Sequence, residues 1–215
     1  MPAELRDILT FNGIADYFNT EALEIWVLLV GIFVAVMAIN ITTKEFKNGS
    51  YELIYTLNMS RGEIVRTKLL RLIVNTLYIN LVSFIASLVS LLIFGFNEFK
   101  VVNLIVYALF ATLVTLQVAV LVFSLGLLNK NKFSTAGGVI VVVVMYLFTT
   151  FSMVGSDNST KWLGYLSPLS TMRGSIMTNG FKGVFTDGIL FAVWSVISLL
   201  LLFISAKKFE NDDLC

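Results

Sequence analysis

Residues 45–71 read EFKNGSYELIYTLNMSRGEIVRTKLLR and are the longest polar segment between two hydrophobic runs. Basic side chains concentrate in and beside this segment: Lys44, Lys47, Arg61, Arg66, Lys68 and Arg71. Lys and Arg collect in short loops on the cytoplasmic side of membrane proteins, because moving them across a bilayer is costly. The segment therefore predicts a cytoplasmic loop that joins two membrane-spanning helices.

The middle of this loop has the pattern of a short amphipathic helix. Ser50 is a favourable N-cap residue, and Glu52 lies in the first turn, where the helix dipole favours an acid. Tyr51, Ile54 and Leu57 recur every three residues and form an apolar stripe. Such a helix fits two interpretations: a docking surface for a soluble partner, or a helix that lies on the lipid headgroups. These residues by themselves favour neither.

The end of the loop carries the start signal of the next helix. Ser60 and Glu63 have the spacing of a capping box, in which the Ser hydroxyl and the Glu carboxylate each bind a free backbone N–H. The pattern predicts that a long helix opens directly at this box.

The loop resembles the cytoplasmic loop of type-2 ABC exporter permeases. In that family the loop reads Glu, a few residues, Gly, Glu-Leu and then Pro-x-Ser-Arg, with Ile and Lys following into the next span. The matching residues are Glu45, Gly49, Glu52, Leu53, Ser60, Arg61, Ile64 and Lys68. Asn58 stands where the family has Pro. The ending is also similar at Phe209, Asp213 and Leu214, although residues 210–212 are acidic where the family has basic residues.

This resemblance implies a permease subunit that forms half of a translocation path with a second permease subunit, as a homodimer or a heterodimer. It also implies a separate ABC ATPase that drives export. The residues that the resemblance assigns to ATPase coupling are Glu45, Gly49, Glu52, Leu53, Ser60, Arg61, Glu63 and Lys68. The family usually has six spans, and this chain resembles spans two to six, so we expect the first of the usual six to be lacking.

Composition indicates a membrane protein independently of the resemblance. The chain is 57% hydrophobic and 13% charged, with a mean hydropathy of +0.87, and a soluble chain of 215 residues could not bury so much apolar surface. A net charge of +1 gives no reason to expect nucleic-acid binding. The chain has no His and a single Cys, Cys215, so it has no His-based catalysis and no internal disulfide.

Five hydrophobic runs are long enough to cross a bilayer. We expect spans at 24–40, 67–94, 101–128, 133–154 and 188–206 in one transmembrane permease domain covering residues 1–215. The expected fold class is an all-α polytopic bundle, with a cytoplasmic coupling loop at 41–66 and an extracellular segment at 155–187.

Successive spans cross the membrane in opposite directions, so the connections between them lie on alternate sides, and the distribution of Lys and Arg between the two sides predicts the orientation. Ten of the fifteen Lys and Arg residues then fall on the side of the 45–71 segment and five on the other, a twofold bias in the expected direction. We therefore expect a multi-pass protein of a bacterial plasma membrane, with a cytoplasmic C-terminus and an extracellular N-terminus of this chain.

Residues 155–187 are long for a structureless loop. Ser167 and Pro168 form a helix start, with Ser at the cap and Pro at the first position. Leu169, Met172 and Ile176 then share a face. We expect one or two short helices here, either re-entrant, as in the resembled family, or interfacial.

We expect the basic start of the 67–94 span to stand out of the bilayer, and between the charged ends of the spans the polar residues are amides and hydroxyls. Intramembrane charges mark ion pathways, so their absence argues against a secondary carrier coupled to protons or sodium. Amides and hydroxyls in spans more often join helices than bind substrate. The candidates for lining a path are Asn80, Ser87 and Ser90.

The sequence contains no catalytic motif. It lacks a phosphate-binding G-x-x-x-x-G-K-[ST] loop, an H-E-x-x-H helix and a nucleophile elbow, and we assign no catalytic, cofactor or metal site. If ATP drives transport, the ATPase is therefore another polypeptide. Two other hypotheses stay open beside the exporter permease: a secondary carrier, and a non-transport membrane protein such as an assembly factor or an enzyme subunit.

Overall fold

The computed structural model describes residues 23–47, 60–94, 101–129, 133–154, 160–172 and 181–211. Within these ranges the chain is helical and contains no strand. The elements in chain order are α3 (Leu23–Lys47), α5 (Arg61–Phe94), α6 (Val101–Asn129), α7 (Thr135–Val154), the 3-10 helices η3 (Lys161–Leu166) and η4 (Pro168–Thr171), and α9 (Phe181–Asn211). The five α-helices are each long and apolar enough to cross a membrane. The expected all-α polytopic bundle is confirmed.

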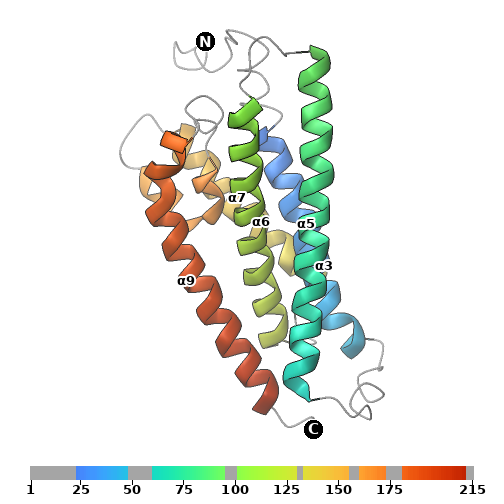
Figure 1. The fold of residues 1–215 in the computed structure, drawn as a ribbon. Helices are drawn as coiled ribbons and strands as arrows, with labels where there is room; N and C mark the ends of the chain where they lie inside the picture. The colour runs from blue at the N-terminus through green and yellow to red at the C-terminus, as the bar shows by residue number, and fades with distance from the viewer. Residues whose placement is uncertain are drawn as a thin grey trace.

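The long helices run alternately in opposite directions, so their ends gather at two faces of the bundle (Figure 1). The end of α3, the start of α5, the end of α6, the start of α7 and the end of α9 share one face, which we call the basic end. The 34 residues of α5 extend for about 51 Å, against a hydrocarbon core of about 30 Å. Its terminal turns therefore project beyond the core.

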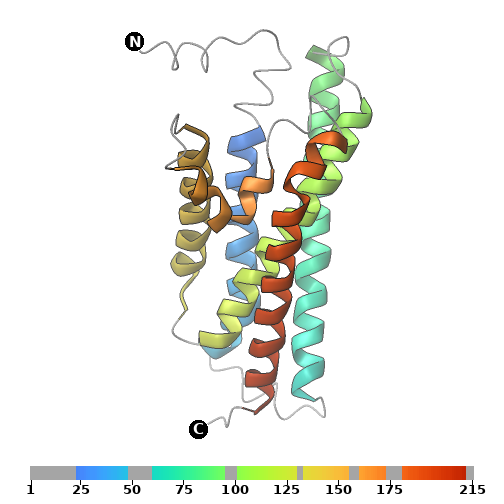
Figure 2. The same ribbon diagram turned by 90° about the vertical axis from the view of Figure 1, so that its left-hand side faces the viewer.

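Helix α6 is the centre of the bundle. It packs against α9, α3 and α5, and α3 also packs against α7 (Figure 2). In the membrane-spanning windows, 61% of α6 is buried within the protein, against 17% of α5 and 11% of α9. The outer faces of α5 and α9 therefore present apolar side chains such as Leu81 and Leu199, which are 55% and 61% exposed.

Small residues allow α3 to approach its neighbours closely. A Cβ at Gly126 of α6 would collide with the Thr42 side chain of α3, and one at Gly138 of α7 would lie 2.8 Å from Ile39 Cγ1. The Gly137–Gly138 pair thus marks a close helix contact, and Gly138 is the member that makes it. Close packing of this kind stabilises helix association in lipid, where burial of apolar surface contributes little.

The helices extend beyond the apolar spans that the sequence predicts. Helix α3 continues past residue 40 to Lys47, and α5 begins at Arg61 rather than near residue 67. Thr42 and Thr43 lie in this extension, and their hydroxyls bond to the Ala38 and Ile39 carbonyls one turn back. Hydropathy locates the lipid-embedded part of a helix, whereas the helix itself ends where its backbone hydrogen bonds end.

The segment 160–172 forms two short helices, where the sequence predicts one or two, at the face opposite the basic end (Figure 1). Ser167 caps η4, since its Oγ accepts from the Leu169 N–H at 3.2 Å, and Pro168 occupies the first position. Leu169 and Met172 are 2% and 6% exposed. This segment is therefore packed into the bundle against α7, α9 and α6. The expected third member of its apolar face, Ile176, lies outside the described residues.

Candidate functional site

The capping box at the start of α5 forms as the sequence predicts. The Ser60 N–H donates to Glu63 Oε2 at 2.8 Å, and the Glu63 N–H donates to Ser60 Oγ at 3.3 Å. The first intrahelical bond runs from the Ile64 N–H to the Ser60 carbonyl at 3.2 Å. Two free amides of the first turn are thereby satisfied, and α5 has a sharply defined beginning.

Arg61 connects this beginning to the end of α9. Its Nη1 donates to the Glu210 carbonyl oxygen at 3.0 Å, across 149 residues of sequence. A cation at a helix C-terminus interacts favourably with the unpaired carbonyls and the helix dipole. Gly62 stands beside the same residue, because a Cβ there would lie 2.6 Å from Glu210 Oε1. The start of α5 and the end of α9 therefore meet at one junction.

The surroundings of this junction carry charged side chains of both signs. An open hollow at its surface is lined by Ser60, Arg61, Gly62, Glu63, Arg66 and Glu210. The described Lys and Arg positions on the basic end are Lys44, Lys47, Arg61, Arg66, Arg71, Lys207 and Lys208, and Lys68 is buried nearby within α5. Those on the opposite face are Lys161 and Lys182. The fold thus gathers on one face the basic residues of helices that are distant in sequence.

The structure places some of the expected coupling residues and leaves others out. Ser60, Arg61 and Glu63 come together at the α5 junction. Glu45 belongs to the last turn of α3, on the same face. Lys68 lies two turns into α5 and is 8% exposed, so it belongs to the bundle interior rather than to the rim. Gly49, Glu52 and Leu53, and the expected short helix around them, lie outside the described residues.

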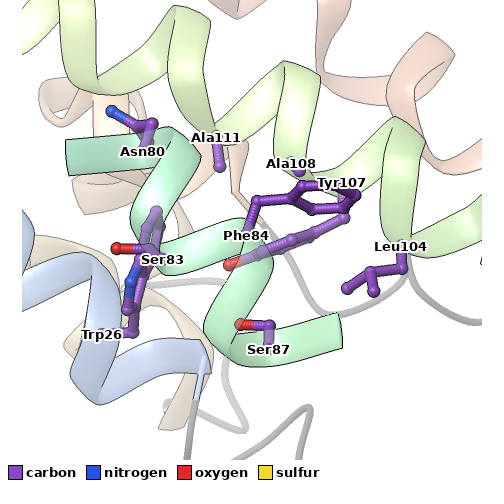
Figure 3. Close-up of a pocket in the computed structure, with 9 residues that line it drawn as sticks. All are labelled: Trp26, Asn80, Ser83, Phe84, Ser87, Leu104, Tyr107, Ala108 and Ala111. Atoms are coloured by element: carbon purple, nitrogen blue, oxygen red, sulfur yellow. The ribbon is translucent and has the colours of Figure 1, made fainter. Parts of the chain in front are cut away.

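The expected path-lining residues follow one face of α5. Asn80 is 5% exposed, and its Nδ2 donates to the Thr76 carbonyl at 2.8 Å and to Thr115 Oγ1 of α6 at 2.9 Å. Ser87 lies two turns further on and is half-buried, and Ser90 is exposed. Asn80 and Ser87 line a small cavity between α3, α5 and α6 (Figure 3). Ser90 does not belong to its lining.

Three polar positions in the interior escape the sequence analysis. Trp26 of α3 and Tyr107 of α6 line the same cavity, but an aromatic residue in an apolar run carries no signal of that role. Asp187 of α9 is 7% exposed. It falls one residue before the predicted span, and α9 begins six residues earlier still. The predicted span therefore excluded Asp187 from the helix, and only the observed start of α9 places it there.

The described part of the chain contains no cluster of three or more His, Cys, Asp or Glu side chains that could hold a metal ion. What the fold and these sites define is a polytopic helical membrane protein with a charged helix junction at one face and a small polar cavity between three of its helices. The chain belongs to the DUF2705 family, described as proteins of unknown function, whose model matches residues 7–215. No curated protein and no solved structure matches the chain.

Proposed function

We propose that the chain is the membrane-spanning permease subunit of an ATP-driven exporter in the plasma membrane. A second permease subunit completes the translocation path, and a separate ABC ATPase binds at the basic end. The observation that carries this proposal is the α5–α9 junction, where the Ser60–Glu63 capping box and the Arg61–Glu210 bond join two long helices.

The junction suits the transmission of motion from a bound ATPase. A force on the loop before Ser60 enters α5 through a first turn in which the capping box holds the Ser60 and Glu63 amides. Arg61 carries part of the same displacement to α9. Both helices pack on α6 but are mostly exposed on their outer faces, with 17% and 11% of their spans buried. Because α9 packs extensively on α6, a displacement that Arg61 passes to α9 reaches the centre of the bundle.

The orientation follows from the charges. Over the whole sequence, alternating spans put ten Lys and Arg residues on the side of the basic end and five on the other, which fits a cytoplasmic basic end, because Lys and Arg in short loops stay inside. The segment 160–172 then lies at the extracellular face. There it occupies the place of the re-entrant helices that close the outer end of the path in type-2 exporter permeases.

The test uses two single variants, Glu52→Ala and Arg61→Ala, and each is first checked for normal levels in the membrane. If the loop docks in an ATPase, losing one member of a desolvated charged pair costs about 2–5 kcal/mol, and co-purification of the ATPase and transport both fall sharply. A helix that only lies on anionic lipid predicts a neutral or mildly favourable effect of Glu52→Ala. Wild-type co-purification and transport in both variants would refute the coupling role.

Arg61 needs an additional control, because its side chain also supports α9 inside the chain. The thermal stability of each variant in detergent separates the two roles. A loss of ATPase binding at unchanged stability supports docking, whereas a loss of stability reports the broken Arg61–Glu210 bond. Robust ATP hydrolysis by the purified chain alone would contradict the proposal outright, since the sequence has no phosphate-binding loop.

A further inference from the structure

A small cavity of about 20 Å³ lies between α3, α5 and α6 (Figure 3). This volume is that of one water-sized group. Its polar lining consists of Trp26 from α3, Asn80, Ser83 and Ser87 from α5, and Tyr107 from α6. The α5 residues of the lining fall toward the end of the α5 window, and Trp26 and Tyr107 fall near the beginnings of the α3 and α6 windows, so the cavity lies toward the end of the bundle opposite the basic end.

Two buried polar atoms at this cavity have no hydrogen-bond partner: the donor Trp26 Nε1 and the acceptor Asn80 Oδ1. Asn80 cannot turn to find one, since its Nδ2 is held by both the Thr76 carbonyl and Thr115 Oγ1. An unsatisfied donor or acceptor in an apolar medium costs several kcal/mol by transfer measurements. The cavity therefore offers a donor and an acceptor to a group that can serve both.

An open apolar groove of about 470 Å³ adjoins the cavity on the outer surface of α5 and α6. The two share Asn80, Phe84 and Ala108 in their linings, so the polar cavity lies directly beside an apolar surface. The rest of the groove is lined by Leu77, Tyr78, Leu81, Ile105, Leu109 and Thr112. Neither lining contains Lys, Arg, Asp or Glu, so nothing there balances a charged ligand.

We propose that the cavity and the groove together form a binding site for a neutral amphiphile that carries a hydroxyl group on a long apolar chain. The hydroxyl accepts a hydrogen bond from Trp26 Nε1 and donates one to Asn80 Oδ1, and the chain lies along the groove. A hydroxyl is the size of the cavity and has both functions in one atom. The assignment stands without the ATP-driven reading, because it concerns binding by this chain alone.

The experiment is photolabelling of the purified full-length chain in nanodiscs with hexadecanol that carries a diazirine in its chain. The comparison probes have the same chain and diazirine, one without the hydroxyl and one with a carboxylate in its place. We expect the alcohol to label peptides of α5 and α6 at the groove, and to do so several-fold more strongly than either comparison probe. Equal labelling by the alcohol and the alkane would overturn the proposal, since the groove would then hold any acyl chain.

Two variants with matched controls locate the site. Trp26→Phe removes the N–H and keeps most of the ring, and it should weaken labelling by the alcohol about fivefold, the effect of losing one ordinary hydrogen bond. Trp162→Phe, at a Trp that is 56% exposed in η3, should change nothing. Ala108→Leu fills the space where the cavity and the groove meet, and it should abolish the preference for the alcohol over the alkane. Its control is Ala86→Leu on the exposed face of α5, which should keep that preference. Unchanged labelling in Trp26→Phe and Ala108→Leu would refute the site and leave the cavity to water.

Discussion

Ser60 and Glu63 have a structural role within the chain itself, which does not depend on a bound partner protein. Their reciprocal bonds satisfy two backbone amides, and both residues lie at the surface of the basic end. Arg61, between them, has a second role, because it holds the end of α9. Substitutions of Ser60 or Glu63 therefore affect the start of α5, whereas a substitution of Arg61 affects the contact with α9. The three residues nevertheless belong to one sequence motif.

Glu63→Ala should lower the free energy of unfolding, because the Ser60 N–H loses its side-chain partner at the start of α5. Glu63→Gln keeps an acceptor oxygen at the same place and should lose less than half as much. Thermal unfolding of both variants in one detergent checks this. Equal losses in the two variants would show that the negative charge, and not the capping bond, is what stabilises the turn.

At the scale of elements, the segment 160–172 is held by polar bonds to two different helices. Thr149 Oγ1 of α7 donates to Ser167 Oγ at 2.9 Å, and Trp194 Nε1 of α9 donates to the Tyr165 carbonyl at 3.1 Å. Short 3-10 helices have little stability of their own, so these bonds and the burial of Leu169 keep the segment in place. Any opening of this face requires that they break.

Ser167→Ala removes both the η4 cap and the partner of Thr149. Loss of a cap costs about 1 kcal/mol, so the amides of residues 167–172 should exchange with deuterium about fivefold faster than in the wild type. Hydrogen exchange with mass spectrometry measures this. Thr150→Val is the control, because the Thr150 hydroxyl bonds to the Tyr146 carbonyl of its own helix, and it should leave exchange in the segment unchanged. Wild-type exchange in Ser167→Ala would show that apolar packing alone holds the segment.

For the whole molecule, the separation of charge between the two faces leads to a prediction of topology. A reporter enzyme that is active only outside the cytoplasm should be silent when fused after Lys132, in the connection between α6 and α7, and active when fused after Lys182, at the start of α9. Activity at the first position, or silence at the second, would reverse the orientation. It would also place the proposed ATPase contact on the wrong side of the membrane.

Much of this architecture is visible in the sequence, because it depends on local patterns. Long apolar runs require helices that satisfy their own backbone in lipid, so the five spans and the all-α class follow directly. The Ser60–Glu63 box and the Ser167–Pro168 cap follow as well, because each depends on residues within one turn. The helix ends are less well predicted, since helices such as α3 and α9 continue through polar turns that hydropathy excludes.

Only the tertiary structure decides which helix faces meet one another. The α6 and α9 runs look equally apolar, yet 61% of one span and 11% of the other are buried within the protein. Lipid tails are as apolar as Leu, so hydrophobicity cannot distinguish a face that packs on protein from one that faces lipid. The Arg61–Glu210 bond and the meeting of Trp26 with Asn80 depend on those packing choices. The sequence by itself determined the spans and their caps, and packing between distant helices decided the junction and the cavity.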